Sequence, residues 1–226
     1  MPGLIHIVGA RPNFIKAAPV VSALEAAGAD QQLIHTGQHY DRRMSEVFFE
    51  ELGLPEPDLN LGVGSGSHAT QTAALLVAME ETFTSAAPER VIVYGDVNST
   101  LAAALTCAKL GIPIAHVEAG LRSFDDTMPE EINRRVTDIL SDPLYVTAPE
   151  GEQNLAREGI RGDRVVFVGN PMIDTLLANL DRFDPAPVQR QLGVEAPYAV
   201  ATLHRPANVD TAEAAAALVD ALREAT

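Results

Sequence analysis

The feature that most constrains the fold is an alternation of short apolar runs with longer stretches of helical periodicity. The apolar runs are four to six residues long, and most lead into a turn of glycine or polar residues. This alternation predicts an α/β fold with a parallel sheet wrapped by helices, because consecutive parallel strands need a crossover connection. The predicted strands are residues 4–8, 32–35, 91–94, 114–117, 144–147, 165–168 and 198–203.

The stretches between these runs have the apolar spacing and the end signals of helices. Gly28, Gly53 and Gly111 follow three of them, as expected for helix ends, and Pro129 suits a first helical turn. Residues 54–67 are rich in proline and glycine and predict a loop. The predicted helices are residues 14–27, 44–52, 69–83, a stretch ending at Leu110, one beginning at Pro129, 150–158 and 211–224.

A change of organisation follows residue 170. A helix there leads into a proline-rich connector near residues 183–188, which is typical of a domain boundary. We therefore expect an N-terminal Rossmann-like domain over residues 1–170, and a connector with the start of a second Rossmann-like domain over residues 171–226. One strand and one helix cannot bury their own apolar faces, so this second domain is expected to be incomplete.

Composition excludes several classes of function. The formal net charge is −15, whereas nucleic-acid binding depends on lysine and arginine neutralising phosphates. No apolar run approaches the roughly 18 residues of a membrane span, and no signal peptide is apparent. The single cysteine, Cys107, excludes an internal disulfide. We therefore expect no nucleic-acid or membrane partner and a reducing, cytoplasmic environment.

Ionisable residues follow several of the predicted strands. Arg11 and Lys16 flank the helix start after the first strand, where they could hold a phosphate or simply be surface cations. The segment is not a Gly-x-Gly-x-x-Gly dinucleotide loop. Asp96 and Asn98 follow a strand as Asp-x-Asn, which taken alone favours a helix cap.

The stretch from Ile114 to Asp142 carries the strongest signal. Glu118 ends an apolar strand, and a carboxylate there must be paired, metal-bound or held with a raised pKa, which favours a functional use. Glu130 and its neighbour Glu131 could complement a helix dipole, and Glu130 with Arg134 could form an ordinary i,i+4 pair. His204, beyond the last predicted strand, is placed for function. No metal-binding spacing occurs, so no metal is expected.

Together, in this order, the segments resemble the non-hydrolysing UDP-N-acetylglucosamine 2-epimerase family. The block VEAGLR…PEEINR is highly specific, and the resemblance covers essentially the whole chain. The matching segments are GARPNFIKAAPV at 9–20, TGQHYD at 36–41, YGDVNSTLAAAL at 94–105, HVEAGLRSFDDTMPEEINRRVTD at 116–138, VGNPMID at 168–174 and TLHRPANVD at 202–210.

The resemblance implies a GT-B-like pair of Rossmann-type domains with a UDP-sugar between them. It implies an isomerase that eliminates UDP anti, with loss of the C2 proton, and adds UDP back to the 2-acetamidoglucal with C2 inverted. No NAD or other cofactor is needed. A homodimer is expected from the resemblance alone. By motif, the resemblance implies catalytic roles for Asp96, Glu118, Glu130 and His204 and substrate-binding roles for Arg11, Lys16 and Arg134.

Two departures from the family pattern bear on activity. Gln38, His39 and Gln71 match positions that bind an activating UDP-GlcNAc in many bacterial members, but Thr70 stands where an arginine is common. The chain also ends before the segment that holds uracil and ribose in the family. We therefore expect little or no turnover from the 226-residue chain alone unless another chain completes the cleft.

Two other functions stay open at this point. A related epimerase acting on a UDP-diacetamido uronic acid fits the same motifs. A non-catalytic nucleotide-sugar-binding fragment is the alternative outside the enzymes. The sequence does not assign which carboxylate is the base and which is the acid.

Overall fold

A computed structural model of the chain describes residues 3–37, 49, 51–202 and 210–225. The chain divides into two compact units, residues 1–181 and residues 182–226. The division falls after Asp181, close to the connector near residues 183–188, whereas the expected N-terminal domain ended at residue 170. The helix α7 (Pro171–Asn179) belongs to the first unit and packs on α1 (Arg11–Ala26). The Thr175 hydroxyl of α7 donates to the Ile15 carbonyl of α1 at 2.7 Å.

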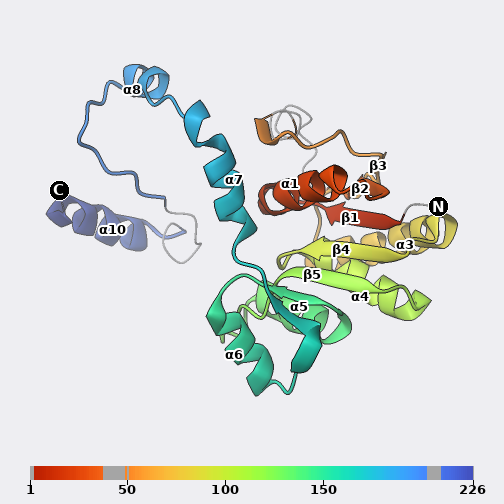
Figure 1. The fold of residues 1–226 in the computed structure, drawn as a ribbon. Helices are drawn as coiled ribbons and strands as arrows, with labels where there is room; N and C mark the ends of the chain where they lie inside the picture. The colour runs from red at the N-terminus through yellow and green to blue at the C-terminus, as the bar shows by residue number, and fades with distance from the viewer. Residues whose placement is uncertain (1–2, 38–48, 50, 203–209, 226) are drawn as a thin grey trace. The chain divides into compact units, whose positions relative to one another are not determined.

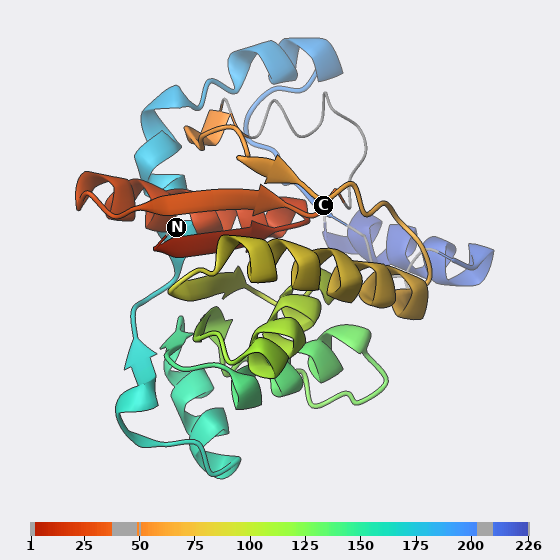
Figure 2. The same ribbon diagram turned by 90° about the vertical axis from the view of Figure 1, so that its right-hand side faces the viewer.

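The first unit is built on one seven-stranded parallel sheet (Figures 1 and 2). The order is β3-β2-β1-β4-β5-β6-β7, so the chain runs outward from β1 in one direction and then returns to start again at β4. The predicted parallel α/β fold is confirmed. The strands are β1 Leu4–Val8, β2 Gln31–His35, β3 Leu59–Asn60, β4 Arg90–Tyr94, β5 Ile114–Ala119, β6 Leu144–Val146 and β7 Val165–Phe167.

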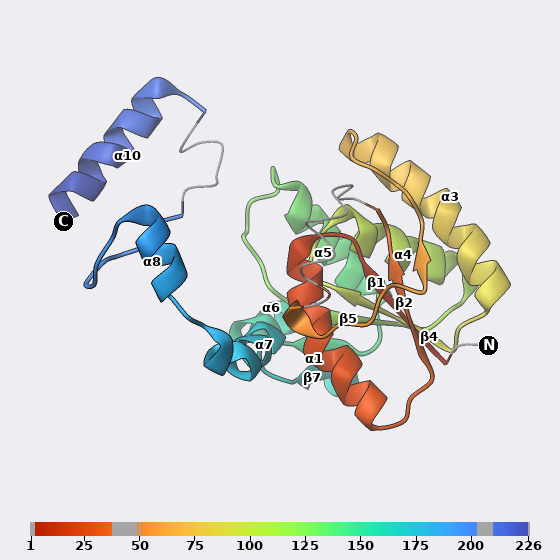
Figure 3. The ribbon, with the colours of Figure 1, turned by 90° about the horizontal axis from the view of Figure 1, so that it is seen from above.

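Helices cover both faces of this sheet. Figure 3 shows α3 and α4 on one side of the strands and α1 on the other. No described helix is long and apolar enough to cross a membrane. Besides α1 and α7, the first unit contains α3 His68–Ala86, α4 Asn98–Leu110, α5 Pro129–Leu140, α6 Pro149–Arg157 and the short 3-10 helix η1 Gly162–Arg164, and η2 (Leu180–Arg182) follows α7.

The strand side chains alternate between two apolar cores, as expected when both faces of a sheet are covered. Ile5 and Ile7 of β1 pack toward α3 and α4, whereas Val8 packs toward α1. In β4, Val91 and Val93 face the first core, and Ile92 and Tyr94 face the second. A smaller cluster under α6 contains Ala119, Leu144, Val146 and Leu155.

Two sequence expectations differ from the structure. Residues 54–67 were expected to form a loop, but Leu59–Asn60 form the edge strand β3, which is too short to show alternation. Residues 198–202 of the predicted strand 198–203 form no strand, and Val200 is 80% exposed. A strand needs a neighbour for its backbone hydrogen bonds, and no strand is found among the described residues of the second unit. That unit contains α8 Ala186–Leu192 and α10 Ala212–Ala225, the latter close to the predicted helix 211–224.

The strand order fixes where a ligand can be bound. β1 and β4 are neighbours, and the chain leaves them toward opposite edges of the sheet. In open α/β sheets, ligands bind outside the carboxyl ends of the strands at such a switch point. A ligand site is therefore expected at the turns after β1, β4 and β5.

A buried polar network lies beneath this edge. His6 of β1 is fully buried, with Nδ1 2.7 Å from the Tyr94 hydroxyl and Nε2 2.9 Å from Gln31 Oε1. Since an amide oxygen only accepts, Nε2 carries the proton and Nδ1 accepts from Tyr94. Burial lowers the pKa of His6 from 6.5 to about 4, although the hydrogen bond to Gln31 acts in the opposite sense.

We predict that His6 makes the fold sensitive to mild acid. Between pH 6.5 and 4 the unfolded chain binds a proton at His6 and the folded chain does not, so the free energy of unfolding falls as the pH falls. The loss over this window should be on the order of 3 kcal/mol. Denaturant titrations at several pH values should show a shallower pH dependence for His6→Gln than for the unsubstituted chain. Equal slopes would contradict the prediction.

Candidate functional site

The turn after β1 is fixed by a residue that the sequence did not single out. Asn13, 1% exposed, accepts hydrogen bonds through Oδ1 from the backbone N–H groups of Gly9 and Ala10, at 3.1 and 3.0 Å. Its Nδ2 donates to the Tyr94 carbonyl at 2.7 Å, which ties the start of α1 to the end of β4. The sequence did contain a signal for this role, because Asn13 stands three residues after the Gly9-Ala10 pair that follows the first strand.

Lys16 and Glu118 meet beside the turn after β4. Lys16 of α1 is 7% exposed, and its Nζ forms an ion pair with Glu118 Oε2 at the end of β5. Of the three possibilities that the sequence left open for Glu118 (a charged partner, a metal or a raised pKa), the structure shows a charged partner. Gly95 lies against this pair, and a Cβ at Gly95 would lie 2.8 Å from Lys16 Nζ. The backbone is the stronger reason for a glycine here, since φ is +66°, whereas the flexible end of Lys16 could shift to admit a Cβ.

The backbone at Glu118 is strained. Its φ is +78°, a left-handed conformation that non-glycine residues rarely adopt. The pairing of β5 with β6 shifts register between Val117 and Ala119, so Glu118 is the extra residue of a β-bulge. Such strain persists only where the surrounding structure enforces it, and it is frequent at functional sites.

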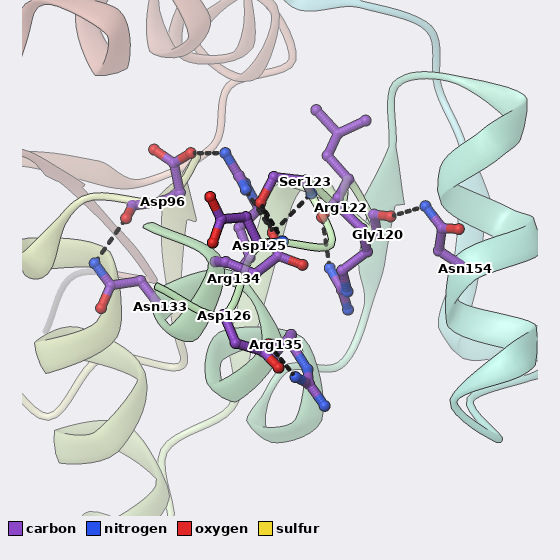
Figure 4. A network of polar contacts seen from close by, with 12 residues as sticks. Asp96, Gly120, Arg122, Ser123, Asp125, Asp126, Asn133, Arg134, Arg135 and Asn154 are labelled. Carbon is purple, nitrogen blue, oxygen red and sulfur yellow. Dashed lines mark hydrogen bonds and ion pairs between the residues drawn. The ribbon is translucent and has the colours of Figure 1, made fainter. Parts of the chain in front are cut away.

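Asp96 is tied to α5 and does not cap α4. Arg134 Nη2 donates to Asp96 Oδ2 at 2.5 Å, and Asn133 Nδ2 donates to the Asp96 carbonyl at 2.8 Å (Figure 4). The N-cap of α4 is Val97, and Asn98 is the first helical residue. The helix-cap interpretation of Asp96 and Asn98 is therefore wrong, because both side chains have partners on other elements. Asn98 bonds to Gln71 at 2.8 Å and lies 3.2 Å from His68 Nδ1.

A buried carboxylate connects two of the strand-end turns. Asp138 of α5, fully buried, accepts from His116 Nδ1 at 2.7 Å, Arg122 Nη1 at 2.8 Å and the Gly120 amide at 3.1 Å. Burial alone would raise the pKa of Asp138, but the hydrogen bonds and charges of His116 and Arg122 outweigh it and hold the pKa below its usual value. His116 Nε2 lies 2.8 Å from the Gly95 carbonyl oxygen. Both ring nitrogens therefore lie within hydrogen-bond distance of oxygen atoms, Asp138 Oδ1 and the Gly95 carbonyl.

The loop after β5 is held from two sides. Arg122 also donates from Nε and Nη2 to both oxygens of Glu158, at 2.8 and 2.7 Å. Asn154 of α6 donates to the Gly120 carbonyl at 3.0 Å (Figure 4). Gly120 has a φ of +79°, and a Cβ there would lie 2.5 Å from the Gly151 carbonyl oxygen. The close approach of this loop to α6 therefore requires glycine at position 120.

Glu130 and Arg11 have different surroundings from those expected. The suggested Glu130–Arg134 pair is wrong, since Arg134 bonds to Glu131, through Nη1 at 2.8 Å, and to Asp96. Among the described residues, the half-buried Glu130 side chain has no hydrogen-bond or ion-pair partner. Arg11, the first residue of α1, is exposed. The structure therefore joins Lys16 to Glu118 and Asp96 to Arg134, and it leaves Glu130 in the first turn of the helix that carries Arg134.

The remaining predicted positions lie apart from these pairs or outside the described residues. Gln71 of α3 is 5% exposed and donates to the Gly64 carbonyl at 3.2 Å, and Thr70 bonds to Ser67. Gln38, His39 and His204 lie outside the described residues. Over the described part of the chain, no group of three or more histidine, cysteine or acidic side chains is placed to hold a metal ion.

The doubly wound parallel sheet, with paired acids and cations at the carboxyl ends of β4 and β5, defines a Rossmann-type α/β protein with an ionisable site at its switch point. Comparison with known proteins makes this assignment specific. The profile of the UDP-N-acetylglucosamine 2-epimerase family matches residues 22–226, and the chain belongs to that family, with its GT-B-like α/β fold class.

Two relatives and one crystal structure illustrate the similarity. A UDP-N-acetylglucosamine 2-epimerase of Methanocaldococcus jannaschii is 43% identical over 222 residues, which cover 96% of this chain and 61% of that protein. The UDP-2,3-diacetamido-2,3-dideoxy-D-glucuronate 2-epimerase of Pseudomonas aeruginosa is 44% identical, with 98% and 62% covered. A crystal structure of the M. jannaschii UDP-GlcNAc 2-epimerase with UDP-GlcNAc and UDP matches with a TM-score of 0.88 and 43% identity, over 98% of this chain and 62% of that one. The chain thus spans 61% and 62% of these relatives' lengths.

The strain at Glu118 generates one prediction. Glu118→Gly and Glu118→Ala both remove the carboxylate, but only glycine adopts a φ of +78° without strain. Glu118→Gly should therefore be more stable than Glu118→Ala by about 1 kcal/mol in denaturant titrations. An alanine variant of equal or greater stability would show that the bulge relaxes when the carboxylate is removed.

The ion pair between Lys16 and Glu118 generates a second prediction about stability. Lys16→Met should destabilise the fold by about 3 kcal/mol, because it leaves a largely buried carboxylate without its cation. Glu118→Gln should destabilise it for the converse reason. The double variant should lose clearly less than the sum of the two single losses, measured by equilibrium unfolding. Simple additivity would mean that the two charges do not interact.

Proposed function

We propose that the chain carries the first-domain half of a non-hydrolysing UDP-N-acetylglucosamine 2-epimerase, which interconverts UDP-GlcNAc and UDP-ManNAc. In the forward direction the C2–H and C1–O bonds break, a C1=C2 bond forms, and UDP leaves anti to the proton. UDP then adds back to the 2-acetamidoglucal while C2 is protonated on the opposite face. Atoms and charge balance without a redox cofactor.

One observation carries this proposal. At neighbouring strand ends the chain places two carboxylates, each against a single cation, namely Glu118 against Lys16 and Asp96 against Arg134. Proton transfer at a sugar carbon needs an acid and a base near each other, and loss of a diphosphate needs positive charge. A purely phosphate-binding turn would need only the cations.

The proposed roles follow from this arrangement and from the motifs. Asp96, Glu118 and Glu130 are the candidate acid and base groups. Lys16, Arg11 and Arg134 would stabilise the negative charge on the departing diphosphate. His204 would assist at that phosphate. The C2 proton is only weakly acidic, so C1–O cleavage running ahead of proton loss, with oxocarbenium character, is the more plausible course.

A second epimerase activity has support of its own. The diacetamido uronate 2-epimerase of P. aeruginosa is 44% identical to this chain, against 43% for the M. jannaschii enzyme. The same elimination and addition at C2 would serve either sugar. Comparing UDP-GlcNAc with the uronate-bearing nucleotide sugar for C2 exchange would separate the two substrates.

The remaining partner assignments are also proposals. The resemblance supports a homodimer, which sedimentation of the purified chain would test. The presence of a single cysteine, Cys107, which cannot form an internal disulfide, supports a reducing, cytoplasmic location. Activation by a second UDP-GlcNAc is supported by Gln71 and weakened by Thr70, and it would appear as sigmoidal substrate dependence.

Deuterium exchange tests the proposed function. Because the 226-residue chain alone is expected to turn over little, UDP-GlcNAc in D2O is incubated with an equal concentration of the chain, and slow appearance of deuterium at C2 is the expected result. Equal concentrations make one turnover per chain sufficient for detection by mass spectrometry. Glu118→Gln should abolish the exchange, whereas Asp126→Asn, in an exposed ion pair with Arg135, should not affect it. Binding of UDP-GlcNAc without exchange would favour a non-catalytic nucleotide-sugar-binding module.

A further inference from the structure

We infer that Glu131 is a positioning residue of this site, which holds Arg134 against Asp96 and fixes the loop between β5 and α5. The inference rests on the proposed function, since it concerns the same acid and base groups. It distinguishes Glu131 from its neighbour Glu130, to which the motif resemblance gives the chemical role. The contacts of the two adjacent carboxylates are the evidence.

Glu131 is saturated with hydrogen-bond donors. Its residue is 1% exposed, although it lies in the first turn of α5, where acids usually face solvent. Oε2 accepts from the backbone N–H of Ser123 at 2.8 Å, from the Ser123 hydroxyl at 2.9 Å and from Arg134 Nη1 at 2.8 Å. Burial alone would raise the pKa of Glu131, but bonds from Ser123, Arg134 and the Phe124 backbone outweigh it and keep the pKa below its usual value.

Through these contacts Glu131 connects the loop between β5 and α5 to the guanidinium of Arg134. Arg134 uses Nη1 for Glu131 and Nη2 for Asp96, so a single planar group is held between carboxylates from α5 and from the turn after β4. The donors of a guanidinium are rigidly related, so fixing Nη1 also fixes where Nη2 points. Without Glu131, Arg134 would keep only the bond to Asp96 and could rotate around it.

A structural role limited to the helix end does not account for this arrangement. A favourable dipole interaction requires only a negative charge in the first turn, and Glu130 supplies one at the neighbouring position. Glu131 in addition anchors Ser123, whose loop contains Phe124 in a left-handed conformation with φ of +58°. The carboxylate therefore stabilises a strained loop and an arginine at once, next to a candidate reactive group.

The experiment compares Glu131→Gln, Arg134→Lys and the double variant in the 226-residue chain. Glutamine keeps an acceptor for Ser123 but loses the charge that holds Arg134, and lysine keeps the charge but lacks the rigid planar fork with which Arg134 reaches both carboxylates. Each single variant should slow C2 deuterium exchange at saturating UDP-GlcNAc by roughly 10- to 100-fold, the loss expected from a small misplacement. The half-saturating UDP-GlcNAc concentration for Glu131→Gln should change less than threefold, and the double variant should be little slower than either single variant, because the residues act together.

Asp126→Asn is the matched control, since the Asp126–Arg135 pair joins the same loop to the same helix at 3.0 Å but is exposed. It should leave the exchange rate unchanged. Exchange by Glu131→Gln within twofold of the unsubstituted chain would overturn the inference, and so would multiplicative losses in the double variant. Unfolding curves identify any variant whose slower exchange comes from misfolding. Ser123→Ala removes only the hydroxyl donor to Glu131, so it then provides a milder test, in which the exchange rate should fall by a smaller factor.

A second readout separates this inference from the proposed function. Nitrogen-15 spectra of the arginine side chains report restricted rotation of the Arg134 Nη groups, and this restriction should disappear in Glu131→Gln but persist in Asp126→Asn. If the unsubstituted chain exchanges no C2 proton, the proposed function fails. The Arg134 signals still decide the role of Glu131: an unchanged spectrum in Glu131→Gln overturns it, and loss of restriction supports it.

Discussion

The structure of the site depends on the buried carboxylate of Asp138. An ionised carboxylate without solvent is tolerated only when charged and polar donors surround it. Here the donors are the His116 ring, the Arg122 guanidinium and the Gly120 amide. Because His116 also reaches the Gly95 carbonyl, one side chain of α5 fixes the turns after β4 and β5 relative to each other. Asp96 and Glu118 lie at these two strand ends, so their spacing follows from this interaction.

The strain at Glu118 becomes intelligible on this basis. A left-handed glutamate costs about 1–2 kcal/mol and would relax if its neighbours were mobile. The turns on both sides are held by Asp138, and Lys16 attracts the carboxylate from α1. Contacts from α5 and α1 therefore hold an unfavourable backbone conformation, in which the Glu118 carboxylate lies against Lys16 and beside Gly95. Preorganisation of this kind avoids rearrangement at the moment of reaction.

Much of the fold was predictable from the sequence, because burial on both faces of a parallel sheet leaves apolar runs that periodicity detects. Edge strand β3 was missed because a strand of two residues is too short to show an alternation of apolar and polar side chains. The strand at 198–203 was wrongly expected because an apolar run does not by itself provide a neighbouring strand to pair with. The site was predictable as a set of strand-end residues. Its pairings were not: helical spacing allows both Glu130 and Glu131 to reach Arg134, and only the loop at Ser123 decides between them. Asn13 and Asp138 were not singled out, because their partners lie on other elements of the fold.

The two adjacent glutamates in the first turn of α5, Glu130 and Glu131, have different surroundings. A group that exchanges protons with a substrate must be able to exist in both protonation states, and several donors directed at a carboxylate oppose its protonation. Glu131, held by Ser123 and Arg134, is stabilised in its charged form and suits a fixed structural charge. Glu130, with no partner among the described residues, keeps its oxygens available for a ligand. The neighbouring positions are therefore not interchangeable, because the loop that folds back onto Glu131 holds one carboxylate and leaves the other without a partner among the described residues.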